Sequence, residues 1–139
     1  MKDKYKLLVV NRNEELTGKL EENNEAGFYI EAAQTAALAI EKVKNDKYHI
    51  ILIDTDIPDK DGIELLKEIK NYDPLAQIIM TTNQSTMEKI LSSLEYGAND
   101  YITDPMLNLE ELKNMIDYSI EKLERWRKSI IDLVNNIIL

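Results

Sequence analysis

Polar and charged side chains follow four short apolar runs of this chain, at positions where they could act together. Half of them are carboxylates, and the others are an amide, a hydroxyl and a single cation. Such a set can form ion pairs and hydrogen bonds or supply oxygen ligands to a metal ion. The candidate cluster consists of Asn11, Arg12, Asp54, Asp56, Thr82 and Asp104.

Several other kinds of active site are excluded by what the chain lacks. It contains no cysteine, which rules out disulfides, thiolate metal sites and cysteine nucleophiles. Its one histidine, His49, rules out multi-histidine metal centres and leaves little scope for a Ser-His-Asp triad, so we interpret it as structural. No Gly-rich loop follows the first apolar run, which disfavours a nucleotide-binding enzyme. We therefore expect no catalytic residues.

The length and net charge of the chain further limit the class of protein to which it can belong. The chain has 139 residues, the size of one ordinary domain, and 44% of them are hydrophobic. The net charge of −9 argues against nucleic acid or an anionic membrane as a direct partner. No apolar run approaches the roughly 20 residues of a membrane span, and the N-terminus lacks the apolar region of a secretory signal. We expect a cytoplasmic protein.

Apolar runs alternate with amphipathic stretches along the chain. Short apolar runs are typical of strands buried on both faces, and the stretches between them have helical spacing. The alternation predicts an α/β fold with a five-stranded parallel sheet in the order 2-1-3-4-5 and helices on both faces. The functional site of such a sheet lies outside the carboxyl ends of its strands, where the candidate cluster falls. The expected strands span residues 6–10, 28–32, 49–53, 77–80 and 100–103, and the expected helices residues 13–23, 35–45, 62–71, 85–96 and 108–139.

Four separated motifs resemble the receiver domains of two-component response regulators. The segment ILIDTDIPDKDGIELLKEIK is similar to the phospho-acceptor region of that family. The segments KLLVVNRNEE, IIMTTNQ and EYGANDYITDP are similar to its first, fourth and fifth strand regions. The motifs occur in the family's order and extend over most of the chain. The resemblance implies a flavodoxin-like fold and a role in phosphorelay signal transduction.

The resemblance also implies roles for individual residues. Asp54 takes the position of the phospho-acceptor, Thr82 that of the switch hydroxyl and Tyr101 that of the switch aromatic residue. The remaining matches are Asp56, Pro58, Asp61 and Gly62 behind the acceptor, and Pro105 in place of a proline that usually follows a cis bond.

Two departures from the family affect its chemistry. The family carries two adjacent acids after its first strand, which hold Mg²⁺ together with the acceptor, but here Asn11 and Arg12 occupy those positions. The family also carries a lysine after its fifth strand, where this chain has Asp104. Phosphoryl transfer to a carboxylate needs positive charge on the transferring oxygens, usually from a metal and a lysine. We therefore expect that Asp54 is not phosphorylated at a useful rate.

The same departures bear on metal binding. An arginine cannot ligate a metal, and its fixed charge repels one. We expect no cofactor and no metal site, with Asp54 and Asp56 as weak candidate ligands; Mg²⁺ is implied only if the chain is an active receiver. The simpler arrangement is an ion pair of Arg12 with Asp54, Asp104 or both.

The last expected helix is longer than a receiver-type domain needs, extending about 45 Å at 1.5 Å per residue. Its apolar residues keep a 3-4-3-4 spacing, interrupted only by Ser119, which is typical of a coiled-coil seam. We expect residues 1–120 to form the receiver-like domain and 121–139 a helical extension that dimerises or leads to an output domain; folding back onto the domain is the alternative. The seam residues are Leu109, Leu112, Ile116, Leu123, Trp126, Ile130, Leu133 and Ile137.

These observations leave three functional interpretations. The leading one is a signalling module that works without phosphorylation, through dimerisation or protein contacts. The second is an active receiver that a histidine kinase phosphorylates on Asp54, and the third is a small doubly wound nucleotide-binding enzyme. The expected partners are a second copy of the chain in a parallel dimer, and a histidine kinase or a downstream output domain.

Overall fold

Strands and helices alternate along residues 5–138, the part of the chain that the computed structural model describes. The strands are β1 (Lys6–Val10), β2 (Tyr29–Ala33), β3 (Ile50–Asp54), β4 (Gln77–Thr82) and β5 (Asp100–Thr103). The helices are α1 (Glu15–Glu22), α2 (Ala36–Asn45), α3 (Gly62–Tyr72), α4 (Met87–Glu95) and α5 (Leu109–Ile138).

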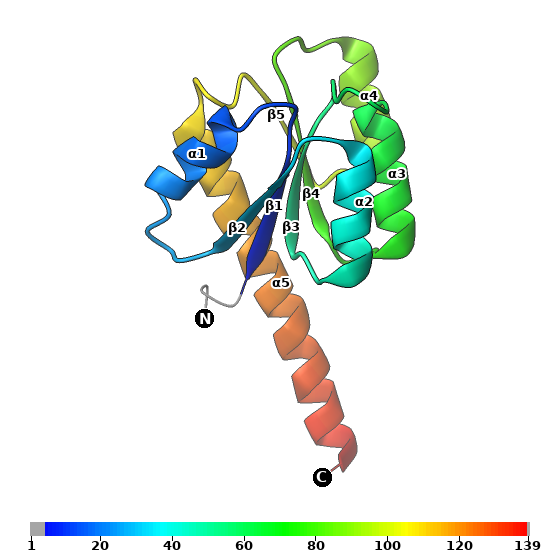
Figure 1. The fold of residues 1–139 in the computed structure, drawn as a ribbon. Helices are drawn as coiled ribbons and strands as arrows, with labels where there is room; N and C mark the ends of the chain where they lie inside the picture. The colour runs from blue at the N-terminus through cyan, green and yellow to red at the C-terminus, as the bar shows by residue number, and fades with distance from the viewer. Residues whose placement is uncertain (1–4, 139) are drawn as a thin grey trace.

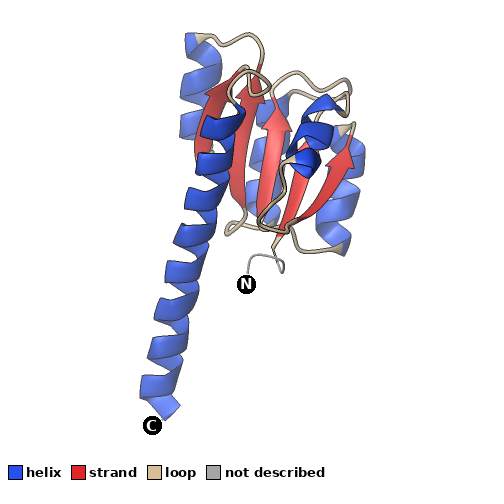
Figure 2. Ribbon diagram, turned by 90° about the vertical axis from the view of Figure 1, so that its left-hand side faces the viewer, coloured by secondary structure: helices blue, strands red, loops and turns tan. Residues whose placement is uncertain are grey.

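The five strands form one sheet in the order β2-β1-β3-β4-β5, with every neighbouring pair parallel (Figure 1). Helices cover both faces of the sheet (Figure 2). The central strand β3 is buried at all five positions, which explains its uninterrupted apolar sequence before Asp54. The predicted fold class, strand order and long final helix are confirmed.

Two apolar cores hold the layers together. One lies between the sheet and helices α2 and α3, and includes Ala39, Ile51 and Leu66. The other lies between the sheet and helices α1 and α5, and includes Leu20 and Ile116. Alternate residues of each strand enter opposite cores, because successive side chains of a strand point to opposite faces.

The element boundaries differ from the expected ones by a few residues. Strand β4 continues through Thr81 and Thr82, which are buried despite their hydroxyl groups. Helix α4 begins at Met87 instead of Ser85, because the Thr86 side chain accepts a hydrogen bond from the Lys89 amide and caps the helix.

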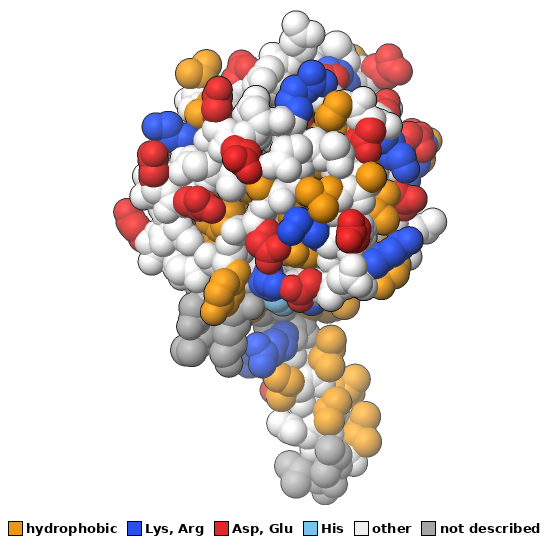
Figure 3. Space-filling view, in the orientation of Figure 1, with side chains coloured by type: hydrophobic (Ala, Val, Ile, Leu, Met, Phe, Trp, Pro, Cys, Tyr) orange, Lys and Arg blue, Asp and Glu red, His pale blue; other side chains and the backbone are white. Residues whose placement is uncertain are grey.

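Helix α5 extends beyond the domain that its first half covers. Leu112, Ile116 and Ile120 are buried against the sheet, and Leu123 packs partly against the same core. Beyond Leu123 the helix first passes Tyr5, which borders a hollow with Glu124 and Arg127, and then projects from the domain without folding back (Figures 1 and 2). Hydrophobic side chains gather along this projecting part (Figure 3), where the large exposed ones are Trp126, Ile130, Ile131, Leu133, Val134 and Ile137. None of the described helices is both long and apolar enough to cross a membrane.

Candidate functional site

The carboxyl ends of the strands bring the candidate cluster to one edge of the sheet. Asp54 is the last residue of β3 and lies beside Thr81 of β4 in the sheet register. Asn11 follows β1, the strand on the other side of β3, and Asp104 follows β5. Parallel pairing therefore places Asn11 beside the Asp54 side chain, whereas Asp104 lies at the same edge of the sheet but two strands away.

Asp54 is the buried centre of the site, with 8% of its surface exposed. Its Oδ1 accepts a hydrogen bond from the Asp56 amide at 2.8 Å, and its Oδ2 accepts one from Asn11 Nδ2 at 3.2 Å. Burial raises the pKa of the Asp54 carboxyl, and the nearby charge of Asp56 adds to this. The Asp56 amide, Arg12 and Lys89 act in the opposite direction. The carboxylate is thus held in place, but the hydrogen bond and the two cations do not fully offset the cost of removing its charge from water.

Arg12 does not form the ion pair that the sequence predicted. Its Nε and Nη2 donate hydrogen bonds to the main-chain carbonyl of Asp56, at 3.2 and 3.0 Å. Within residues 5–138 it makes no ion pair with Asp54 or Asp104. Arg12 remains exposed, whereas both oxygens of the buried Asp54 already accept hydrogen bonds. The guanidinium therefore bonds an acceptor at the surface and acts on Asp54 only through its charge.

Lys89 is a second cation of the site, and the sequence reasoning missed it. Its Nζ lies 3.4 Å from Asp56 Oδ2 and donates a hydrogen bond to the Gln84 carbonyl at 2.8 Å. The other candidate residues lie at strand ends, whereas Lys89 lies in the first turn of α4. The available signal was its position three residues after Thr86, in the first turn of a helix that follows β4. Helical side chains tilt toward the N-terminus of their helix, so the Lys89 side chain points back toward the strand ends.

The hydroxyl group of Thr82 makes three hydrogen bonds inside the protein. Its Oγ1 accepts a bond from Thr55 Oγ1 at 3.0 Å and donates one to the Gln84 carbonyl at 3.1 Å. The Gln84 amide also donates to this oxygen, at 3.1 Å. Thr55, buried beside Asp54, was not among the sequence candidates. The hydroxyl of Thr82 thus fixes the loop after β4.

Tyr101 and Asp104 occupy the edge of the site on β5. The half-buried ring of Tyr101 packs against the α2–α3 core, and its hydroxyl lies 3.1 Å from Ser85 Oγ. Asp104 adopts a left-handed conformation with φ 49°, and its amide donates to the Thr82 carbonyl at 2.7 Å. The peptide bond before Pro105 is trans.

The residues present do not fit a magnesium ion. Mg²⁺ needs oxygen ligands in a near-octahedral arrangement, and the nearest are the Asp54 carboxylate and the Asp56 carbonyl. That carbonyl already accepts both hydrogen bonds from Arg12. No group of three or more acidic or histidine side chains suited to a metal occurs in the described part of the chain. Arg12 therefore occupies one of the two candidate ligands and brings a positive charge next to it.

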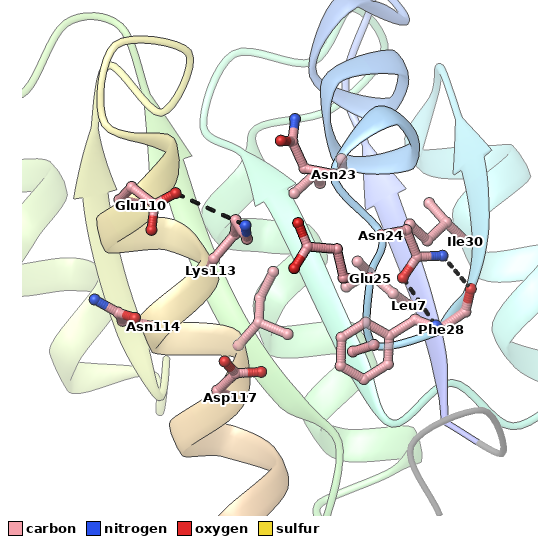
Figure 4. A pocket seen from close by; sticks show the side chains of 13 residues that line it. Leu7, Asn23, Asn24, Glu25, Phe28, Ile30, Glu110, Lys113, Asn114 and Asp117 are labelled. Atoms are coloured by element: carbon pink, nitrogen blue, oxygen red, sulfur yellow. Dashed lines mark hydrogen bonds and ion pairs between the residues drawn. The ribbon is translucent and has the colours of Figure 1, made fainter.

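An open hollow of about 840 Å³ extends from the site between α3 and α4. Arg12 and Lys89 border it near Asp56, and Lys67 lies at its other end, over the ring of Tyr96. A separate hollow of about 250 Å³ lies between the α1–β2 loop and α5 (Figure 4). The polar side chains on that rim belong to elements away from the strand ends, so we assign it no part in the site.

A doubly wound sheet whose central strand ends in a buried, hydrogen-bonded aspartate defines a receiver-type signalling fold. The chain belongs to the response regulator receiver domain family, whose model matches residues 8–117.

Individual relatives agree with this assignment. The chain is 33% identical over 112 residues to the transcriptional regulatory protein KdpE of Staphylococcus aureus, covering 80% of this chain and 48% of that protein. It is 35% identical over 100 residues to the chemotaxis protein CheY of Halobacterium salinarum, covering 71% and 83%. A two-component response regulator from Clostridium difficile superposes with a TM-score of 0.80 at 29% identity, covering 86% of this chain and 98% of that one. The chain thus spans about half the length of its KdpE relative.

Proposed function

We propose that this receiver domain transmits signals without being phosphorylated, and that it acts through dimerisation of α5. The observation that carries the first part is the bond between Arg12 and the Asp56 carbonyl. A phosphoryl group passing to Asp54 needs cations on its own oxygens, and here Arg12 and Lys89 are already bonded to Asp56. Losing the metal and the family's lysine removes several kcal/mol of transition-state stabilisation, each 1.4 kcal/mol being about tenfold in rate.

Incubation with acetyl phosphate and Mg²⁺, followed by intact-mass measurement, tests this part. We expect no mass gain of one phosphate within minutes. An Asp54→Asn variant is the matched control, because it keeps the shape of the side chain but cannot accept phosphate. A rapid mass gain in the wild-type chain that is absent from Asp54→Asn would contradict the proposal.

The second candidate function is an active receiver that a histidine kinase phosphorylates on Asp54. It is favoured by the position of Asp54, which ends the central strand directly before Thr55 and Asp56, two residues that line the open hollow. The same experiment distinguishes the two candidates. Under this candidate Lys89 would neutralise the phosphoryl group, so a Lys89→Met variant would lose the mass gain that the wild type shows.

The dimerisation part rests on the exposed apolar surface of α5. Trp126 is 67% exposed, Ile130 57%, Leu133 60% and Ile137 74%, an unusual amount of apolar surface for a monomer. These four residues follow the heptad spacing, so a second α5 can pack along them. Burying them from two chains is worth on the order of 10 kcal/mol before the entropy of association.

The division of the chain follows from the same surface. We infer that residues 1–120 form the receiver part and that 121–139 form a helical extension that dimerises or leads to an output domain. Ile120 is buried and Leu123 partly so, which supports a boundary just beyond residue 120. The partners we propose are a second copy of the chain and a kinase or output domain.

A further inference from the structure

His49 and Tyr5 meet at the end of the sheet from which α5 leaves the domain. Their rings lie edge to face with centroids 4.9 Å apart. Tyr5 is 8% exposed and belongs to the core beneath α5. It also borders a hollow with Glu124 and Arg127, which lie about one and two turns beyond Ile120, the last buried residue of that helix. Tyr5 therefore lies where α5 leaves the sheet.

One directional hydrogen bond holds the His49 ring in this place. The amide of Lys6 donates to His49 Nδ1 at 3.1 Å, and the His49 amide donates to the Lys6 carbonyl at 3.0 Å. An Nδ1 that accepts a hydrogen bond carries no proton, so the ring is neutral with its proton on Nε2. Protonation would place an N–H on Nδ1 facing the N–H of Lys6, and the bond between them would be lost.

The charges around His49 come from several elements. Burial lowers the pKa of the His49 ring, and the positive charges of Lys47 and Lys6 lower it further, while two carboxylates oppose them. The neutral ring is therefore the stable form at pH 7. The groups that act on the ring are Lys6 of β1, Asp46 and Lys47 between α2 and β3, and Asp73 between α3 and β4, with Glu124 and Arg127 of α5 beyond Tyr5.

We propose that His49 is a proton-sensitive support of α5. Protonation breaks the bond to the Lys6 amide and loosens Tyr5, so that the turn of α5 around Glu124 and Arg127 separates from the domain. Because the folded-state pKa lies below the ordinary value of about 6.5, the support is complete above that pH and is lost as the pH falls through the folded-state pKa. The device does not involve Asp54, which lies at the opposite end of β3.

Hydrogen exchange tests the proposal on the full chain. Protection of α5 residues 120–127 is measured at pH 7.0 and 5.5, after correction for the intrinsic pH dependence of exchange, with α3 as the internal reference. We expect protection in α5 to fall by about threefold or more at the lower pH while α3 is unchanged. The chain has one histidine, so its Cε1–H signal in a proton NMR titration gives the pKa of His49 without ambiguity.

Two variants make the result specific. His49→Asn keeps an acceptor near the position of Nδ1 but does not titrate, so its α5 protection should be the same at both pH values. Tyr5→Phe keeps the ring and removes the hydroxyl beside Glu124 and Arg127, so it should lower α5 protection already at pH 7.0. An equal pH response in wild type and His49→Asn would overturn the proposal, as would a histidine signal that does not titrate above pH 5.

Discussion

Arg12 bonds to the main-chain carbonyl of Asp56 through two nitrogens of its guanidinium, and this contact distinguishes the site from a metal-binding pocket. The same Asp56 bonds to Asp54 through its amide and contacts Lys89 through its carboxylate. Two cations of the chain therefore converge on one residue, directly beside the acceptor position. Both cations are thus already bonded to Asp56 and not to the acceptor carboxylate, which supports the proposed independence from phosphorylation.

The first prediction concerns magnesium. Replacing Arg12→Asp together with Asp104→Lys should create a Mg²⁺ site of millimolar affinity, because the first change frees the Asp56 carbonyl and adds a ligand while the second restores charge balance. Isothermal titration calorimetry measures the affinity. Arg12→Lys is the control, since it keeps a cation at this position and should not bind. Magnesium binding by the wild-type chain as tight as by the double variant would contradict the account.

The second prediction concerns the ionisation of Asp54. Its pKa is raised mainly by burial, so the ionised form at pH 7 destabilises the fold relative to a neutral side chain. Asp54→Asn should therefore raise the melting temperature by a few degrees at pH 7. The gain should diminish as the pH falls through the raised folded-state pKa and should vanish below the unfolded-state pKa of about 3.8, where Asp54 is protonated in both states.

Asp56→Asn is the matched control for this measurement. The Asp56 side chain is 59% exposed and lies near Lys89, so removing its charge relieves no burial. We expect clearly less stabilisation from it at pH 7, because the relief of its repulsion with Asp54 is offset by the lost contact with Lys89. Equal stabilisation by both variants would mean that general charge repulsion, and not burial of Asp54, is the cause.

The sequence predicts the fold well because its periodic signal is strong. The uninterrupted apolar run before Asp54 identifies a central strand, and alternation with helices leaves one arrangement for a parallel sheet. Which residues lie at the strand ends follows from the same pattern. The bond of Arg12 to the Asp56 carbonyl could not be predicted from the sequence pattern. It depends on the reach of the side chain and on the hydrogen bonds that Asp54 already accepts. Lys89 was missed because helix rotation, and not strand order, brings it to the site.

The third prediction uses two glycines with opposite surroundings. A Cβ added at Gly62 would lie 2.4 Å from the Asp54 carbonyl oxygen and 2.7 Å from the Thr55 Cα, so backbone would have to move. Gly62→Ala should therefore lower the free energy of unfolding by about 2 kcal/mol or more. A Cβ at Gly18, inside α1, has nothing within 4 Å. Gly18→Ala should raise the free energy of unfolding by about 0.5 to 1 kcal/mol, because alanine has the higher helix propensity. Chemical denaturation measures both, and equal effects would contradict the packing described here.

The fourth prediction concerns dimerisation. The intact chain should scatter light as a dimer at tens of micromolar, whereas a chain ending after Glu124 should be a monomer, since it keeps the buried Ile120 but loses the exposed seam. Leu133→Glu should also give a monomer, because it places a charge on the seam. Asn135→Glu adds the same charge on the opposite side of the helix and should leave the dimer intact. A monomeric wild-type chain would defeat the proposal.

The fifth prediction concerns the direction of the paired helices. In a parallel pair each seam residue meets its own copy, whereas in an antiparallel pair residues near the end of one helix meet the beginning of the other. Since the chain has no cysteine, Ile137→Cys introduces a single thiol close to the end of α5. A parallel dimer brings the two thiols within disulfide distance, so mild oxidation should convert the chain to a covalent dimer on a non-reducing gel. Asn135→Cys, on the far side of the helix, should crosslink much more slowly. A variant that is dimeric by light scattering and yet forms no disulfide at Ile137→Cys would require antiparallel packing.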